Sequence, residues 1–263
     1  MTQVLKIFRQ TQAFLFDLDG TLTIDSRPVP LTAAALAWLK SHGYPIRICT
    51  NTTTLSRATM SARLRDSGFP VEPQEIFSAP AAAVLYLRRH QVKSCCKLLS
   101  PDVRVDFEEF AESDYSAEYI VIGDVGEIWD YALMSRLFRS VMNGSKIITL
   151  HKGRYWLSGG ELKIDIGAFI AGLEFATGAT ALVIGKPSPA FFELALDDLG
   201  IAAAHACMIG DDLINDVQGA QSCGIKGVLV RTGKYRQDQV KAANVKPDLE
   251  IDSVADLPGL LQS

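Results

Sequence analysis

The sequence predicts an α/β fold, in which a doubly wound, Rossmann-like parallel sheet carries an inserted, smaller α/β domain. Short apolar runs alternate with segments of helical periodicity along most of the 263 residues, and this alternation is typical of parallel sheets covered by helices. Four of the apolar runs end directly in a cluster of polar residues. Residues 81–178 continue the alternation without another cluster of that density, which predicts a separate domain.

The first strand is the apolar run Ala13–Phe16, because Gly20 ends this run too early for a helix. The next elements form a βαβα pattern, with helix ends predicted at glycines. A polar loop (Ser26–Pro30) is followed by a helix from Leu31 to Gly43 and by a strand at Pro45–Cys49. A second helix then runs through Leu64 and ends at Gly68.

The inserted domain is predicted to contain three strands and three helices. Its strands are Ser94–Leu99, Glu118–Gly123 and Lys146–Leu150, and its helices are Ala81–Arg89, Asp130–Met142 and Ile166–Thr177. The chain then returns to the parallel sheet through strand Ala181–Gly185, a helix from Phe192 to Leu199, strands Ala206–Gly210 and Ile225–Val230, and a helix near Val254–Leu261. We therefore expect residues 1–80 and 179–263 to form the core and residues 81–178 to form the inserted domain.

The polar clusters lie where four predicted parallel strands end. The first contains Asp17 and Asp19, whose side chains point to the same side of an extended chain. The others are Thr50 with Asn51, Lys186 with Pro187, and Asp211 and Asp212 with Asp216. Because ligands of open α/β sheets bind at the carboxyl ends of the strands, we expect the four clusters to form one site.

The residue types in these clusters predict the chemistry of phosphoryl transfer. A carboxylate such as Asp17 can accept a phosphoryl group, and Asp19 can protonate a leaving group and later deprotonate a water molecule. Thr50 and Asn51 offer neutral hydrogen-bond donors to phosphoryl oxygens, although they can also cap the following helix. Lys186 supplies a positive charge for the phosphoryl oxygens and for the crowded carboxylates.

The last cluster predicts a Mg²⁺ site. Carboxylate oxygens with few basic neighbours suit Mg²⁺, which keeps bound waters and shares the substrate phosphate. We expect Asp211, Asp17 and the backbone carbonyl of Asp19 to be the ligands. Asp212 and Asp216 lie four residues apart on one face of a predicted helix. Each of them either supports the ligands from behind or only caps or compensates the helix N-terminus.

Composition narrows the expected partners and location. A formal net charge of −4 and a pI near 5.6 argue against nucleic acid as a main partner. No membrane span and no signal-peptide pattern are recognisable, so we expect no membrane partner. The cysteines contain no C-x-x-C pair, and buried free thiols in a reducing cytoplasm explain them better than a zinc site does.

The four clusters also resemble a known family. In order, they match the four motifs of the haloacid dehalogenase-like (HAD) hydrolase superfamily, and Asp19 distinguishes the chain from the dehalogenases of that superfamily. The insertion resembles the C2-type cap of subclass IIA. The segments around Lys186, Asp211 and Arg231 are similar to the phospholysine phosphohistidine inorganic pyrophosphate phosphatase-like branch. The resemblance implies a Mg²⁺-dependent phosphatase with the residue roles given above, a small phosphorylated substrate and a homodimer formed through the cap.

The resemblance further implies that the cap closes over the site and selects the substrate. The segment Leu150–Trp156 corresponds to a loop that faces the site in related caps, with His151, Arg154 and Tyr155 as candidate substrate contacts. An ordinary exposed hairpin is the alternative interpretation of this segment. Asp124 and Glu127 are further candidates for approaching the site.

Other functions use the same residue types. A phospho-acceptor signalling protein also gathers acids, a threonine and a lysine at a sheet edge, but it needs neither the inserted domain nor Asp19. A metabolite-binding protein without turnover does not need the complete set of acids. A phosphotransferase with the same aspartyl-phosphate intermediate stays open. The expected function is therefore hydrolysis of a small phosphorylated metabolite, phosphoamide or pyrophosphate, whose identity the sequence does not specify.

Overall fold

The computed structural model describes residues 7–158 and 160–262 of the chain. The chain forms two compact units. The first unit comprises Met1–Thr50, Ala58–Phe77 and Lys186–Ser263, and the second comprises Asn51–Arg57 and Ser78–Gly185. The second unit contains the residues predicted to form the inserted domain, together with additional segments at both ends of it. That this unit works as a cap stays a prediction.

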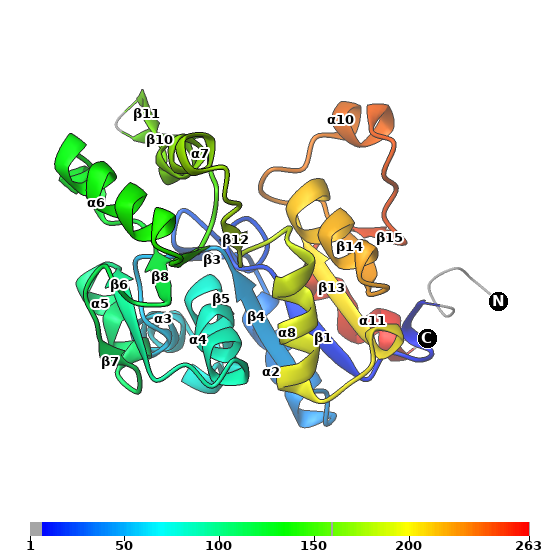
Figure 1. Ribbon diagram of the computed structural model, residues 1–263. Helices are drawn as coiled ribbons and strands as arrows, with labels where there is room; N and C mark the ends of the chain where they lie inside the picture. Colours follow the sequence, from blue (N-terminus) through cyan, green and yellow to red (C-terminus); the bar gives the residue numbers. More distant parts are fainter. Residues whose placement is uncertain (1–6, 159, 263) are drawn as a thin grey trace. The chain divides into compact units, whose positions relative to one another are not determined.

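The first unit is built on a sheet with the strand order β15-β14-β13-β1-β4-β5 (Figure 1). β1 (Ala13–Phe16) pairs in parallel with β13 (Ala206–Gly210) on one side and with β4 (Ile46–Thr50) on the other. The chain extends the sheet first through β4 and later, on the opposite side, through β13. The strand order therefore reverses at β1, and the carboxyl end of β1 is the switch point where ligands of this fold bind.

The remaining elements of the first unit extend and cover this sheet. α2 packs against α11, and α8 packs against α9. The strands are β2 (Thr23–Ile24), β3 (Arg27–Pro28), β5 (Ile76–Ser78), β14 (Lys226–Val230) and β15 (Leu249–Ile251). The helices are α2 (Thr32–Ser41), α3 (Arg57–Asp66), α8 (Pro189–Leu199), α9 (Gly219–Ser222), α10 (Gln237–Ala242) and α11 (Leu257–Gln262), and η5 (Leu213–Gln218) is a π-helical turn.

Burial explains why β1 is a rigid platform. All four of its side chains are inaccessible to solvent, and Phe14 packs edge-on against Tyr44 and beside Phe16. Large aromatic side chains contribute much of the apolar area that a core removes from water. A residue placed directly after this strand is therefore held by a fully buried part of the unit.

The second unit has its own parallel sheet, in the order β12-β9-β8-β6-β7. Apolar side chains of β6, β8 and β9 pack against helices α6 and α7. Ile120 of β8, Leu137 of α6 and Ile170 of α7 are fully buried in this core. The strands are β6 (Ser94–Leu98), β7 (Ala111–Glu112), β8 (Tyr119–Ile122), β9 (Lys146–Thr149), β10 (Tyr155–Ser158), β11 (Glu161–Ile164) and β12 (Leu182–Val183). The helices are α4 (Ala79–Arg89), α5 (Pro101–Arg104), α6 (Tyr131–Met142) and α7 (Ile166–Thr177).

One strand lies in a different sheet from the predicted one. The run Ala181–Gly185 was expected to join the core sheet, but β12 pairs with β9 in the sheet of the second unit. The prediction was wrong because a short apolar run indicates a strand but does not indicate which sheet the strand joins. The expected loop at Ser26–Pro30 also includes β3, which pairs with β2 around Asp25 and Ser26, both of which have positive φ.

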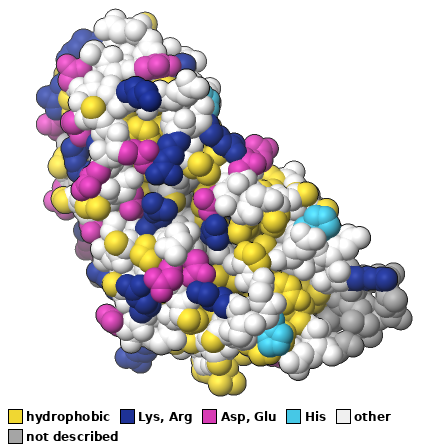
Figure 2. All heavy atoms as spheres, turned by 90° about the horizontal axis from the view of Figure 1, so that it is seen from below, with side chains coloured by type: hydrophobic (Ala, Val, Ile, Leu, Met, Phe, Trp, Pro, Cys, Tyr) yellow, Lys and Arg dark blue, Asp and Glu magenta, His cyan; other side chains and the backbone are white. Residues whose placement is uncertain are grey.

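The surface and the helices bear on the expected partners. On the face seen in Figure 2, Lys and Arg side chains are interspersed with Asp and Glu side chains. None of the described helices is both long and apolar enough to cross a bilayer. All five cysteines are free thiols, and only Cys223 among them is partly exposed. The absence of nucleic-acid and membrane partners stays a prediction.

Candidate active site

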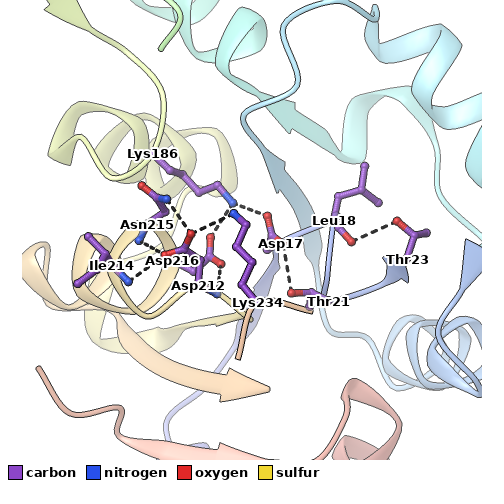
Figure 3. Close-up of polar contacts among 10 residues, drawn as sticks. All are labelled: Asp17, Leu18, Thr21, Thr23, Lys186, Asp212, Ile214, Asn215, Asp216 and Lys234. Carbon is purple, nitrogen blue, oxygen red and sulfur yellow. Dashed lines mark hydrogen bonds and ion pairs between the residues drawn. The ribbon is translucent and has the colours of Figure 1, made fainter. Parts of the chain in front are cut away.

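Asp17 lies at the carboxyl end of β1, directly after Phe16 (Figure 3). Its backbone N–H donates to the carbonyl of Ile209 at 2.9 Å and so continues the pairing with β13. Both carboxylate oxygens have donors: Lys186 Nζ lies 2.6 Å from Oδ1, and Thr21 Oγ1 lies 3.1 Å from Oδ2. Asp17 is thus a buried carboxylate in a fixed orientation.

Lys186 joins this carboxylate to a second one. Its ammonium group donates to Asp17 Oδ1 at 2.6 Å and to Asp216 Oδ1 at 2.7 Å, and the side chain is 3% exposed. Burial favours the neutral amine, but the carboxylates of Asp17 and Asp216 outweigh this effect and raise the pKa of Lys186. Lys186 is therefore a charged group held between two acids.

The loop after β1 is closed by its own backbone. The Leu18 carbonyl accepts from the N–H groups of Leu22 and Thr23, each at 3.0 Å, and Gly20 N–H donates to the Thr23 carbonyl at 2.7 Å. Asp19 projects an exposed side chain from this loop. Partial desolvation, followed by the nearby Asp17 carboxylate, raises the pKa of Asp19, while Lys186 and Lys234 oppose the shift. A raised carboxyl pKa favours the protonated form that a general acid needs.

The acids after β13 have three different environments. Asp211 is 2% exposed; its Oδ2 accepts the backbone N–H of Lys234 at 2.6 Å, and its Oδ1 has no hydrogen-bond partner among the described residues. Asp212 caps the turn η5 by accepting the N–H groups of Ile214 and Asn215 at 3.1 and 2.9 Å. Asp216 uses Oδ1 for Lys186 and Oδ2 for the N–H of Asp212.

This arrangement differs from the predicted helical face. Asp212 and Asp216 were expected four residues apart on a regular helix, but η5 is a π-helical turn with Asp212 as its N-cap. Asp212 is therefore turned to the backbone of the turn, whereas Asp216 is turned back to Lys186. Capping of the helix N-terminus was the alternative role expected for these acids, and Asp212 has it. The π-helical form of the turn is what helical periodicity did not reveal.

The acids fit a divalent cation with oxygen ligands. Asp17, Asp211 and Asp216 each offer a carboxylate oxygen within 4.8 Å of the others. Burial raises the pKa of Asp211 to about 6, the Asp17 carboxylate adds to this shift, and the Lys234 N–H opposes it. The unpartnered Oδ1 of Asp211 has a lone pair to offer, whereas both oxygens of Asp216 already accept hydrogen bonds. Asp211 therefore suits a hard cation such as Mg²⁺. Both oxygens of Asp17 also accept hydrogen bonds, so its part as a ligand stays a prediction, and Asp216 supports Lys186.

The other predicted site residues are Thr50, the last residue of a segment of the first unit, and residues of the second unit. Thr50 ends β4 and is buried, and Asn51 begins the adjoining segment of the second unit. His151 accepts the N–H of Gly153 at 3.2 Å through Nδ1. Arg154 and Tyr155 are exposed. Tyr155 begins the β10–β11 hairpin, and the part in substrate selection predicted for these cap residues stays a prediction.

The prediction from sequence missed two residues that contact the acids and one that contacts the loop after β1. Thr21 donates to Asp17, and Lys234 contacts both Asp211 and Asp212. Thr232 Oγ1 donates to the Gly20 carbonyl at 2.5 Å. A signal for two of them was present, because Thr232 and Lys234 follow the predicted strand Ile225–Val230 in the same way that the four clusters follow theirs.

Known proteins resemble this chain over nearly its whole length. Two family models match it, a haloacid dehalogenase-like hydrolase model over residues 14–112 and a HAD-hydrolase-like model over residues 183–257. The human phospholysine phosphohistidine inorganic pyrophosphate phosphatase is 38% identical over 254 residues, which cover 94% of this chain and 93% of that protein. The human haloacid dehalogenase-like hydrolase domain-containing protein 2 is 38% identical over 245 residues, which cover 93% of each chain.

Solved structures confirm the predicted fold class. The p-nitrophenyl phosphatase from Archaeoglobus fulgidus superposes with a TM-score of 0.87 at 25% identity, covering 97% of this chain and 100% of that one. The 4-nitrophenylphosphatase from Thermotoga maritima has a TM-score of 0.86 at 23% identity, with 96% and 98% covered, and so supports the fold alone. The chain therefore belongs to the haloacid dehalogenase-like hydrolase family, and it is a phosphatase-type enzyme of that family.

Proposed function

We propose that the enzyme is a Mg²⁺-dependent phosphatase that hydrolyses a small phosphorylated metabolite, phosphoamide or pyrophosphate through an aspartyl-phosphate on Asp17. One observation carries the proposal. The Asp17 carboxylate is buried at the switch point of the sheet, and Lys186 and Thr21 each donate to one of its oxygens. A carboxylate whose two oxygens are fixed in direction by hydrogen bonds is suited to attack phosphorus.

In the proposed reaction, Asp17 and Asp19 hydrolyse the substrate in two steps. An Asp17 oxygen forms a bond to phosphorus while the bond between phosphorus and the leaving group breaks, and Asp19 gives its proton to the leaving atom. Asp19, now ionised, takes a proton from water as the water oxygen attacks phosphorus. The bond between Asp17 and phosphorus then breaks, which releases phosphate and restores both carboxyl groups.

Asp19 suits this alternation because its side chain is exposed while its pKa is raised. An exposed carboxyl group is accessible to a leaving group and to water. A raised pKa lies closer to the pH at which the enzyme works, and this favours both giving and taking a proton.

Charge neutralisation is the second requirement. Lys186, whose ammonium group lies 2.6 Å from Asp17 Oδ1, is proposed to balance negative charge on the phosphoryl oxygens. Thr50 and Asn51 are proposed to donate hydrogen bonds to the same oxygens. Asp17, Asp211 and the backbone carbonyl of Asp19 would hold Mg²⁺, with Asp212 and Asp216 behind them. Bound Mg²⁺ supplies positive charge that offsets the repulsion between the acids and the phosphate.

The relatives support the proposed range of substrates. The human relative at 38% identity is named for phospholysine, phosphohistidine and inorganic pyrophosphate, which include P–N and P–O–P bonds. We extend this range to the present enzyme as candidates. His151, Arg154 and Tyr155 are proposed to contact the leaving group, and the second unit is proposed to act as a cap and to mediate a homodimer. A cytoplasmic location fits the free thiols.

The test compares wild type with Asp17→Asn, using an aryl phosphate, phosphoamides and pyrophosphate with Mg²⁺. An amide nitrogen cannot replace an anionic nucleophile, so turnover should fall by at least about 10³-fold while thermal unfolding stays cooperative. Acid-quenched wild type should carry one phosphoryl group on the peptide that contains Asp17, by mass spectrometry. Substantial turnover by the folded Asp17→Asn variant would falsify the proposal.

A further inference from the structure

The turn Thr232–Lys234 contacts both loops that carry the acids of the proposed Mg²⁺ site. Thr232 Oγ1 donates to the Gly20 carbonyl at 2.5 Å, next to Asp19 in the loop after β1. The backbone N–H of Lys234 donates to Asp211 Oδ2 at 2.6 Å. Its side chain donates to Asp212 Oδ2 at 3.1 Å. One turn after β14 thus links the ends of β1 and β13.

The three segments meet so closely that neither Gly20 nor Gly233 has room for a side chain. A Cβ on Gly233 would lie 2.0 Å from Asp211 Oδ2 and 2.5 Å from the Cα of Gly20. A Cβ on Gly20 would also lie 2.0 Å from Asp211 Oδ2. Since both glycines have positive φ, their backbone conformation also disfavours side chains. The turn therefore limits where the Asp211 carboxylate can lie.

This confinement decides which oxygen of Asp211 is available. Oδ2 is occupied by the N–H of Lys234, whereas Oδ1 is buried without a hydrogen-bond partner among the described residues. A buried carboxylate oxygen without a donor is costly unless it binds a ligand. We propose that the turn Thr232–Lys234 is a positioning element, which holds Asp211 Oδ1 and the loop through Gly20 in the arrangement that binds Mg²⁺.

The proposal rests on the proposed Mg²⁺ site and predicts more than stability. If the turn only held β14 to the rest of the unit, variants in it would lower the melting temperature and leave Mg²⁺ affinity unchanged. If the turn positions the acids, Mg²⁺ affinity falls even in variants that remain well folded. The measurement is therefore Mg²⁺ binding to the substrate-free enzyme by isothermal titration calorimetry, alongside thermal unfolding in a chelator.

Two pairs of variants separate these cases. Thr232→Val removes the hydroxyl and keeps the shape, while Thr232→Ser keeps the donor. Gly233→Ala places a Cβ against Asp211, and Gly200→Ala is its matched control, because Gly200 also has positive φ (+68°) but has open space around a Cβ. Both alanine variants pay a similar backbone cost, and only the one at Gly233 meets an acid.

We expect Thr232→Val to weaken Mg²⁺ binding roughly fivefold, as for the loss of one hydrogen bond, and Gly233→Ala to weaken it by more than about tenfold. Thr232→Ser and Gly200→Ala should bind within about twofold of wild type. Folded Thr232→Val and Gly233→Ala variants with wild-type affinity overturn the inference and leave the proposed function intact. If wild type itself binds no Mg²⁺, the proposed Mg²⁺ site fails, and the inference fails with it.

Discussion

Asp211 is a proposed metal ligand whose buried negative charge lowers the stability of the folded enzyme. Burial and the Asp17 carboxylate raise its pKa from the ordinary value of an aspartate to about 6. Because the folded-state pKa is the higher one, its contribution to stability is present below about pH 4 and is lost as the pH rises through about 6. At neutral pH the metal-free enzyme thus holds an unfavourable buried charge.

Asp211→Asn should separate these two roles. The amide keeps the shape and an oxygen acceptor, so the metal-free variant should be more stable than wild type at pH 7.5, by about 1–3 kcal/mol. The gain should vanish near pH 4, where Asp211 is protonated, while Mg²⁺ binding and turnover fall sharply at neutral pH. Urea unfolding in a chelator at both pH values is the measurement. A variant less stable than wild type at pH 7.5 would contradict the assigned pKa direction.

Asp19 carries the proton in both proposed steps, so its removal should slow each of them. For Asp19→Ala, formation and breakdown of the phospho-enzyme should each fall by about 10²–10⁴-fold. Formation should suffer least with an aryl phosphate, because a good leaving group needs little protonation. Rapid-quench kinetics with an aryl and an alkyl phosphate provide the comparison. Unaffected breakdown would remove Asp19 from the general-base role.

At the scale of elements, apolar runs in the sequence predicted most of the strands. The polar residues that follow these runs predicted most of the residues of the candidate site. β1, β4 and β13 were recognised because each is a buried run that ends in polar residues. β5 and β15 were missed because runs of three residues are too short to stand out. The sheet of β12 and the π-helical turn η5 depend on tertiary contacts, which local pattern does not contain.

Contacts to side chains distant in sequence were the least predictable feature of the site. Lys186 reaches Asp17 across 169 residues of sequence, and this contact was predicted because both residues follow apolar strands. Lys234 and Thr232 have the same relation to the sheet, but a Thr-Gly-Lys turn is also a common surface sequence. Their contacts with Asp211 and Gly20 became evident only once the strands were placed side by side.

The segment that carries Asn51 is fastened by acids of the helical turns after β6. The backbone N–H groups of Ser56 and Arg57 donate to Asp102 Oδ2 at 2.7 Å and Asp106 Oδ2 at 3.0 Å, respectively. The Asp106 side chain is only 8% exposed, and Arg57 Nε lies 3.8 Å from its Oδ1. Because these groups are largely shielded from water, losing one partner leaves the other unsatisfied.

Asp106→Ala should therefore loosen the segment from Asn51 to Arg57. We expect a loss of about 1–3 kcal/mol in unfolding free energy and faster amide hydrogen exchange in that segment. Glu109→Ala is the control, because its ion pair with Arg88 is exposed and should contribute about 0–1 kcal/mol. Equal exchange in the segment for wild type, Asp106→Ala and Glu109→Ala would show that Asp106 does not hold it.

At the scale of the whole molecule, the chain passes between the two units next to residues of the proposed site. It enters the second unit between Thr50 and Asn51 and again between Phe77 and Ser78, and it returns to the first between Arg57 and Ala58 and between Gly185 and Lys186. The first and the last of these crossings adjoin predicted site residues in the sequence. The acids and Lys186 belong to the first unit, and the candidate substrate contacts His151, Arg154 and Tyr155 belong to the second. We expect this division to separate catalysis of phosphoryl transfer from selection of the leaving group.

Two sets of variants test the division. Lys186→Ala should lower activity on every substrate, because each presents the same phosphoryl charge. His151→Ala, Arg154→Ala and Tyr155→Phe should instead change the ranking of substrates, since a lost hydrogen bond costs about 0.5–1.5 kcal/mol, or up to about 3 with a charge. This corresponds to roughly several-fold to a hundredfold in kcat/KM for the substrates that use the contact.

The panel for this test contains pyrophosphate, a small aryl phosphate, a phosphoamide and larger phosphate monoesters. Pyrophosphate and the aryl phosphate offer fewer leaving-group contacts, so the variants of the second unit should affect them least. Arg139→Ala, an exposed arginine on α6, is the control for a general effect of removing a positive charge from this unit. A common factor across all substrates would mean that the segment His151–Tyr155 supports closure or folding. Unchanged kinetics in all three variants would mean that it is an ordinary exposed hairpin, and substrate selection would have to be sought elsewhere in the second unit.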